Sequence, residues 1–235
     1  TYGQTVPVER RDEVGTLTET FNDMSQELAK NDKMRRRLFA NIAHELRTPL
    51  AILQGNLEGM IDDVIPTDKK VLLSMEDETL RMGRLIQDLR DLSLAEINEL
   101  TLHKAPHDIN VLLERAVSML QPLCDEKSLA VHLDLARDLP KVSIDVDRIN
   151  QVIYNLLNNA IRYIEAGCTI TVSTLAVTVK GQPYVQVQIA DTGSGIAPED
   201  LQHIFQYFYR SEKSRNRKSG GSGIGLALAQ QFVRS

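Results

Sequence analysis

A histidine with an acidic neighbour stands in the middle of a long helical pattern. Glu45 follows His44 directly, and Thr48 comes one helical turn later. Because a helix turns by about 100° per residue, His44 projects away from the apolar positions Ile42 and Leu46, and Thr48 shares its face. A neutral imidazole on such a face is a nucleophile that can capture a phosphoryl group, and Glu45 can handle its Nδ1 proton. Thr48 can orient a water that hydrolyses a phosphorylated partner.

A second helical pattern carries two asparagines four residues apart. Asn155 and Asn159 share one face of this predicted helix. Amide oxygens are hard, neutral ligands that suit Mg²⁺, and they leave the charge of the metal free to offset a triphosphate. A polar helix surface is the alternative for such a pair, but apolar residues at 152, 153, 156 and 157 surround it. The pair therefore indicates a metal and phosphate site.

Two glycine-rich segments belong to the same candidate site. Residues 191–196 read Asp-Thr-Gly-Ser-Gly-Ile after a predicted strand, and Asp191 can accept a hydrogen bond from an adenine amino group. Residues 220–227 place glycines at the start of a helix, where backbone N–H groups and the positive helix end suit a triphosphate. This second segment lacks the Gly-Lys-Ser/Thr ending of a Walker A motif and the preceding strand of a dinucleotide fingerprint. The first segment alone is equally typical of a plain turn.

The elements that must hold these residues fall into two regions. Residues 1–95 have an almost entirely helical pattern, broken at 62–68, where Pro66 cannot continue a helix and Thr67 or Asp68 can cap the next one. Pro49 predicts a bend just after the histidine. Each long helix has one narrow apolar seam, so two copies of this hairpin are expected to form a dimeric four-helix bundle.

The remainder of the chain has a mixed pattern. Residues 101–110 predict a short strand and a linker, and residues 111–127 and 147–164 predict helices. Residues 129–135, 169–179 and 184–190 alternate as strands do, with a turn at 180–183. The fold class expected is therefore multi-domain: an all-α hairpin followed by an α+β sandwich with a mixed or antiparallel sheet. Residues 211–223, rich in Ser, Arg, Lys and Gly, predict a mobile loop.

Composition narrows the range of functions. The chain has 235 residues, 42% of them hydrophobic, and a net charge of −5, which disfavours nucleic acid as a partner. Cys124 and Cys168 form no metal or redox motif. No apolar run is long enough to span a bilayer. The abrupt start at Thr1 leads us to expect a membrane segment upstream.

The string Phe39–Leu50 resembles the H-box of HisKA-type sensor histidine kinases of two-component systems. The resemblance implies that His44 is the phosphorylated residue, Glu45 the acid/base and Thr48 the phosphatase residue. It implies ATP-dependent autophosphorylation of His44 and transfer of the phosphoryl group to an aspartate of a response regulator receiver domain. It also implies phosphatase activity toward the phosphorylated regulator.

The asparagine segment and the two glycine segments, in this order, resemble the N, G1 and G2 boxes of the Bergerat (GHKL) ATP-binding fold. The resemblance implies ATP and Mg²⁺ as cofactors, with Asn159 as metal ligand, Asn155 as a further candidate ligand, and Asp191 as the reader of adenine. Residues 205–210 resemble the F-box, which starts an ATP lid over 211–219 that includes Lys213, Arg215, Arg217 and Lys218. Each of these four cations has an ordinary solvated surface role as its alternative. Nucleotide contacts are then expected from Asn155, Asn159, Arg162, Tyr163, Asp191, Gly193, Gly195, Ile196, Phe208, Arg210, Gly221, Gly223, Gly225 and Leu226.

Residues 6–15 and the apolar positions that follow them resemble the connector end and second helix of a HAMP domain, which relays signals from a membrane helix. This resemblance implies the cytoplasmic portion of a bacterial inner-membrane receptor. The domains expected are a partial HAMP and signalling helix over 1–33, a dimerisation and phosphotransfer domain over 34–98, a linker over 99–110 and a catalytic domain over 111–235. In the family the catalytic domain continues for two more strands, so we expect this one to be incomplete at its C-terminus.

Two other classes of protein share part of this pattern. A conformational ATPase of the Hsp90 or MutL kind has the nucleotide boxes but does not need His44 on a dimer helix. An ATP-independent scaffold, or a form that acts only as a phosphatase, does not need Asn159, Asp191 and both glycine segments intact.

Overall fold

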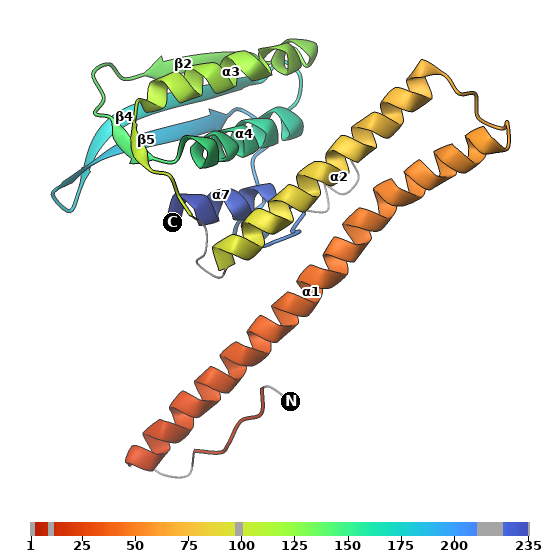
Figure 1. Cartoon of the computed structure of the whole chain (residues 1–235). Helices are drawn as coiled ribbons and strands as arrows, with labels where there is room; N and C mark the ends of the chain where they lie inside the picture. The colour runs from red at the N-terminus through yellow and green to blue at the C-terminus, as the bar shows by residue number, and fades with distance from the viewer. Residues whose placement is uncertain (1–2, 9–11, 97–100, 211–222, 235) are drawn as a thin grey trace. The chain divides into compact units, whose positions relative to one another are not determined.

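The computed structural model describes residues 3–8, 12–96, 101–210 and 223–234. The chain divides into two compact units, residues 1–83 and residues 84–235. Helix α1, Glu13–Ile61, fills most of the first unit, and helix α2, Lys69–Glu96, passes from the first unit into the second (Figure 1). The carboxylate of Asp12 caps α1 by accepting the N–H groups of Val14 and Gly15 at 3.1 and 3.2 Å. The helix then continues through Pro49 to its end without a break.

Residues 3–8 form a strap that lies along α1 beside Asn22 and Ser25. The Asn22 side chain accepts the Val6 N–H and donates to the Val6 carbonyl, both at 2.7 Å. The Ser25 hydroxyl accepts the Gly3 N–H at 3.2 Å and donates to the Gln4 carbonyl at 2.9 Å. Side-chain hydrogen bonds of α1 therefore replace the backbone partners that the irregular strap lacks.

The predicted helix break around Pro66 is confirmed. The Asp68 carboxylate accepts the Val71 N–H at 2.9 Å, so Asp68 caps α2. Ile65 folds back over Gly59, where an added Cβ would lie 2.6 Å from Ile65 Cδ1. A residue larger than glycine at position 59 would therefore require the Ile65 side chain to move.

The second unit contains both helices and strands, as predicted. In chain order its elements after α2 are β1 Ala105–His107, α3 Ile109–Glu126, β2 Ala130–Leu135, β3 Val142–Ile144, α4 Val146–Tyr163, β4 Thr169–Val179, β5 Gln182–Asp191, α5 Pro198–Leu201 and α7 Gly225–Arg234. β2 pairs parallel with β4, and β4 pairs antiparallel with β5. β1 and β3 form a separate antiparallel pair. The sheet is therefore mixed, which is one of the two arrangements that the sequence analysis left open.

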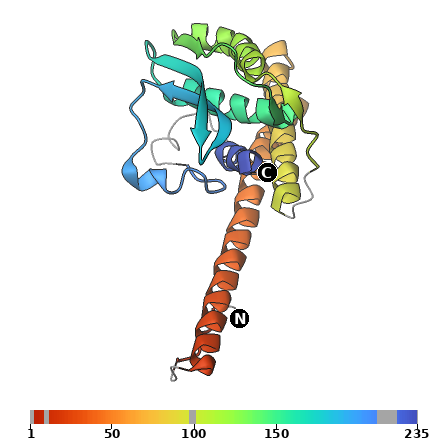
Figure 2. The ribbon, with the colours of Figure 1, turned by 90° about the vertical axis from the view of Figure 1, so that its left-hand side faces the viewer.

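The core of this unit lies between the three-stranded sheet and two helices. Figures 1 and 2 show α3 and α4 on the same face of the sheet. Leu113 of α3, Leu157 of α4 and Ile170 and Val172 of β4 are at most 2% exposed. These side chains join the helices to the sheet in one apolar cluster. α4 also packs against α7.

Some local predictions differ from the structure. β3 was not predicted. The short strand predicted within residues 101–110 is β1, which pairs with β3. The predicted turn at 180–183 is shorter, because Lys180 and Gly181 take positive φ angles of 51° and 79° and β5 already begins at Gln182. Helices α3 and α4 begin at Ile109 and Val146, because Asp108 and Asp145 cap them.

Candidate functional site

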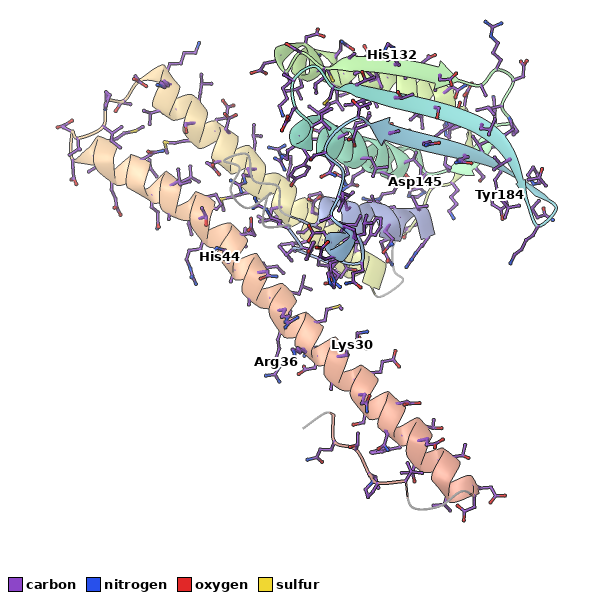
Figure 3. All side chains as sticks on the ribbon, turned by 180° about the vertical axis from the view of Figure 1, so that it is seen from behind. Lys30, Arg36, His44, His132, Asp145 and Tyr184 are labelled. Atoms are coloured by element: carbon purple, nitrogen blue, oxygen red, sulfur yellow. The ribbon has the colours of Figure 1, made fainter. Side chains whose placement is uncertain are left out.

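His44 is an exposed side chain near the middle of α1 (Figure 3). Thr48, one turn later, is also exposed, and its hydroxyl donates a long 3.4 Å hydrogen bond to the His44 carbonyl. Pro49 has no N–H to donate to the carbonyl of Glu45. The three predicted residues of the phosphoacceptor segment therefore lie together on one helix surface, beside a weakened stretch of its backbone hydrogen bonds.

An arginine of α2 faces this segment, and the sequence pattern alone did not single it out. Arg81 Nη2 lies 3.9 Å from Glu45 Oε2, and Arg81 Nη1 lies 3.6 Å from Glu78 Oε2. Only 22% of the Glu45 side chain and 20% of the Glu78 side chain are exposed. Arg81 therefore offers Glu45 a cation from across the hairpin.

Replacement of Arg81 by glutamine is expected to slow phosphorylation of His44 by about two- to fivefold, because a partly exposed ion pair contributes up to about 1 kcal/mol. The initial rate of label incorporation from γ-³²P ATP measures this effect. Arg36, whose Nε lies 2.8 Å from Asp32 on the same helix, provides the matched control (Figure 3). Arg36→Gln is expected to leave the rate unchanged, and equal rates for the two variants would contradict a role for Arg81.

Asn155 and Asn159 of α4 are half-buried, and Asn155 holds the start of α7. Asn155 Nδ2 donates to the carbonyl of Gly225 at 3.2 Å. A Cβ on Gly225 would lie 3.3 Å from Asn155 Oδ1, so the glycine permits this close approach. Asn159 lies one turn further along α4, and among the described residues its side-chain amide makes no hydrogen bond. The N segment and the G2 segment thus meet in the structure.

The donor set fits a magnesium ion carried by a phosphate group. Within the described residues there is no group of three or more His, Cys, Asp or Glu side chains that could hold a metal. The available ligands are the amide oxygens of Asn159 and Asn155. Mg²⁺ keeps several waters and is commonly bound through few protein ligands together with substrate phosphates. Two neutral oxygens therefore fit this metal better than they fit a structural zinc or calcium site.

The Asp191 segment follows β5 and packs against the end of α4. Asp191 Oδ1 accepts the Gly193 N–H at 2.9 Å, and the Thr192 N–H donates to the Thr169 carbonyl at 3.1 Å. A Cβ on Gly193 would lie 2.7 Å from Ile164 Cγ2 and 2.8 Å from Asp191 Oδ1. Glycine is therefore the residue that fits at position 193. The tight turn holds Oδ1 of the exposed Asp191 carboxylate and so fixes the orientation of the carboxylate.

The F-box segment is joined to the second glycine segment. The Phe208 N–H donates to the Gly223 carbonyl at 2.9 Å. Gly223 has a φ of 71°, and a Cβ there would lie 2.9 Å from the Phe208 backbone. Phe208 itself has a φ of 60°, which is uncommon for a bulky residue. This contact therefore holds the F-box segment at Phe208 against the second glycine segment at Gly223.

The other predicted nucleotide residues have mixed surroundings. Arg162 and Tyr163 are half-buried in the last turn of α4. In the same turn, the carbonyl of Ile161 accepts a hydrogen bond from the Lys127 ammonium at 2.8 Å. Gly195 has a φ of 70°, which suits a glycine. Half-buried positions are occupied by Arg210, Gly225 and Leu226, whereas Ile196 and Phe205 are exposed. Gly221 and the lid cations Lys213, Arg215, Arg217 and Lys218 lie outside the described residues.

The chain thus combines a helical hairpin that carries His44 with a layered unit of helices and a mixed sheet, and comparison with known proteins identifies its family. Three family models match: the HAMP domain over 2–30, the His Kinase A (phospho-acceptor) domain over 34–97, and the histidine kinase-, DNA gyrase B- and HSP90-like ATPase over 144–235. The chain is 38% identical to the signal transduction histidine-protein kinase BaeS of Escherichia coli K12 over 95% of its own length and 47% of BaeS.

Solved structures agree with these matches. The Acinetobacter baumannii histidine kinase AdeS is 33% identical, with a TM-score of 0.65, over 81% of this chain and 86% of AdeS. Histidine kinase ThkA in complex with response regulator protein TrrA shares the fold at 21% identity and a TM-score of 0.57, over 78% of this chain and 55% of ThkA.

The chain belongs to the sensor histidine kinase family of two-component systems. This result confirms the predicted family and fold class, a helical phosphoacceptor region followed by a mixed ATPase domain. The chain spans about half the length, or less, of the curated relatives it matches. In the part of the chain that the structure describes, no helix is both long and apolar enough to cross a bilayer.

Proposed function

We propose that this chain uses ATP to phosphorylate its own His44 and then passes the phosphoryl group to an aspartate of a response regulator. The exposed His44 beside Glu45 supports this proposal, in a chain whose second unit joins the N, F and G2 segments through Asn155–Gly225 and Phe208–Gly223. The domain limits given above and the role of each site residue are part of the same proposal.

The residues of the chain have distinct tasks in this reaction. Nε2 of His44 attacks the γ-phosphorus, the bond from phosphorus to the β–γ bridging oxygen breaks, and ADP leaves with that oxygen. Glu45 holds the Nδ1 proton so that the attacking nitrogen keeps its lone pair. Asp191 orients the adenine, while the N–H groups at the start of α7 face the phosphates. Asn159, with Asn155 as a second candidate, would hold Mg²⁺, which offsets the charge of the triphosphate when it is bound.

The chemistry of the label tests this proposal against the alternative ATPase. After incubation with γ-³²P ATP and Mg²⁺, the phosphate is expected to be on the protein in an acid-labile, base-stable form, as a phosphoramidate should be. A conformational ATPase would release all of its phosphate into solution. Stoichiometric release without any labelled protein would overturn the kinase proposal.

Thr48 is proposed to serve the reverse task, hydrolysis of the phosphorylated regulator. Its hydroxyl has only a long bond to the His44 carbonyl, so it can turn toward a water without losing a strong interaction. Thr48→Ala is expected to slow dephosphorylation of the regulator about tenfold or more, because water positioning is lost. Autophosphorylation is expected to change by less than about twofold. Thr79→Ala is the control, since Thr79 makes the same kind of bond, to the Met75 carbonyl on α2.

The proposed partners follow from exposed surfaces and from the family. Large apolar side chains on the helices of the first unit are exposed in the single chain, and a second copy in a four-helix bundle would cover them. The most exposed of these are Leu17, Phe39, Ile61 and Leu80. A response regulator is the proposed phosphoryl acceptor, because the related kinase ThkA forms a complex with the response regulator protein TrrA. The HAMP match supports attachment to the bacterial inner membrane through segments upstream of this chain.

A further inference from the structure

Three charged side chains form a layer in the apolar contact between α1 and α2. Glu45 lies on α1, and Glu78 and Arg81 lie on α2, all in the first compact unit. All three are half-buried. Buried or half-buried apolar residues precede and follow this charged layer on both helices: Ile42 and Pro49 on α1, and Met75 and Met82 on α2. The charged layer lies at the level of His44, the residue before Glu45 (Figure 3).

Stability alone does not explain the charged layer. Apolar residues in place of buried ion pairs are often neutral or stabilising, because the charges lose hydration when they are buried. The layer also has two carboxylates for one guanidinium, which leaves one negative charge in excess. Proteins depart from an apolar seam in this way mainly where a site requires it. The charged layer therefore indicates a task in the chemistry at His44.

Arg81 lies between the two carboxylates without a hydrogen bond to either of them. Its Nη1 is 3.6 Å from Glu78 Oε2, and its Nη2 is 3.9 Å from Glu45 Oε2. Both distances permit an ion pair, but both exceed about 3.2 Å, the usual upper limit of an N–H···O hydrogen bond. Arg81 therefore offsets the charge of Glu45 without occupying the lone pairs of its carboxylate.

Glu78 is the residue that keeps Arg81 in this position. The two residues are three apart on α2, so they are neighbours on one helix face. Oε2 of Glu78 is buried and accepts no hydrogen bond from the described residues, so the charge of Arg81 is what compensates this oxygen. The carboxylate thus attracts the guanidinium back toward α2. Without this attraction, Arg81 can close the 3.9 Å gap to Glu45 and bind it through a charge-assisted hydrogen bond.

We propose that Glu78 is a positioning residue for the phosphorylation of His44: it holds Arg81 away from Glu45, so that the Glu45 carboxylate stays free to accept the Nδ1–H of the imidazole. The proposal rests on the proposed kinase function, in which Glu45 has this task. Glu78 acts through Arg81 and not by contact with the imidazole or the nucleotide.

The charge of Arg81 and the freedom of Glu45 are both required in this arrangement. Without Arg81, Glu45 loses the cation that offsets its charge. With Arg81 bound directly, the Glu45 carboxylate is drawn toward α2 and its lone pairs are occupied, so His44 loses its acceptor. An arginine that has left Glu78 is therefore expected to be more harmful than no arginine at all.

A pair of substitutions with opposing effects tests this proposal. Glu78→Gln keeps the size of the side chain and releases Arg81 toward Glu45. The initial rate of His44 labelling from γ-³²P ATP is expected to fall about tenfold. The KM for ATP should not change, because the candidate nucleotide residues lie in the second unit.

Addition of Arg81→Gln to the Glu78→Gln variant is expected to raise the labelling rate again. The double variant should label at the rate of Arg81→Gln alone, about two- to fivefold below the native chain, because no arginine is left to bind Glu45. Two changes that merely damaged the hairpin would add instead. A double variant slower than both single variants would overturn the positioning role.

Glu76 provides the matched control for the loss of a carboxylate on α2. Its side chain is exposed, two residues before Glu78. Glu76→Gln makes the same chemical change on the same helix and should label at the native rate. Equal labelling rates for Glu76→Gln and Glu78→Gln would contradict the proposal.

The ¹⁵N chemical shifts of the His44 ring, measured without nucleotide, separate this proposal from the kinase proposal. They report which ring nitrogen carries the proton. The native chain should hold the proton mainly on Nδ1, and Glu78→Gln should move a larger share to Nε2. A proton distribution that Glu78→Gln leaves unchanged would overturn the positioning role, whatever the labelling result. The expected redistribution, with no labelling in any variant, would instead overturn the kinase proposal and leave the action of Glu78 on Glu45 intact.

Discussion

Replacement of His44 by glutamine is expected to abolish labelling of the chain by γ-³²P ATP, because an amide nitrogen is not nucleophilic and cannot carry the phosphoryl group. We expect the acid-labile label to fall by at least about a thousandfold, to background. Glutamine keeps a similar length and a polar end, so α1 and its exposed surface are retained. The measurement is the yield of acid-labile, base-stable label on the protein after a fixed time.

A second histidine provides the control for this result. His132 of β2 is exposed like His44, but it has no acidic neighbour on a helix face. The His132→Gln variant is expected to take up as much acid-labile label as the native chain. Affinity for a nonhydrolysable ATP analogue should be equal in both variants, since His44 lies in the first unit and the candidate nucleotide residues lie in the second. Persistent label in His44→Gln would place the phosphoacceptor elsewhere.

Replacement of Gly193 by alanine is expected to weaken the affinity for Mg²⁺–ATP by about tenfold or more, because the new methyl group has no room. Its Cβ would lie 2.7 Å from Ile164 Cγ2 and 2.8 Å from Asp191 Oδ1. Relief of this overlap has to displace either a buried side chain at the end of α4 or the carboxylate proposed to read adenine. Forcing an extra methyl group into a packed position costs about 1–3 kcal/mol. Because the displaced groups belong to the candidate nucleotide site, we expect this cost to appear as weaker binding of the nucleotide.

Calorimetric titration with a nonhydrolysable ATP analogue and Mg²⁺ measures this loss. Gly83→Ala is the matched control, since a Cβ on Gly83 meets nothing within 4 Å and alanine is the better helix former. Its affinity should equal that of the native chain. Equal affinity of Gly193→Ala and the native chain would separate the Asp191 turn from nucleotide binding.

The sequence predicted the regular elements well where apolar periodicity extended over several turns. The long helices, the break at Pro66 and the alternating strands β4 and β5 all have many repeats of one period. β3 has three residues, which is too short for alternation to be recognised, whereas the short strand predicted within residues 101–110 is β1. Helices α3 and α4 begin slightly earlier than the pattern predicted, because aspartate caps at 108 and 145 set their starts.

The candidate site was predictable as far as its residue types go, but its contacts were not. Asn155, Asp191 and Gly193 stand in motifs whose chemistry is visible from spacing. The bond from Asn155 to Gly225 depends on how α4 and α7 pack, which no local pattern contains. Glu78 and Arg81 were missed because a charge on a helical pattern usually marks a solvated face. Only the packing of α2 against α1 shows that these charges are half-buried.

The continuity of α1 gives the first unit a mechanical property. A single helix of 49 residues is a rod of roughly 75 Å, and it carries the strap at one end and His44 along its length. A twist applied at the strap therefore turns His44 with it, and the softest point of the rod, at Pro49, comes only after the histidine. Inserting one residue between 30 and 44 would turn His44 by about 100° relative to the strap while lengthening the rod by only about 1.5 Å. The phosphoacceptor should thus respond to torsion of the input far more strongly than to its displacement along the axis.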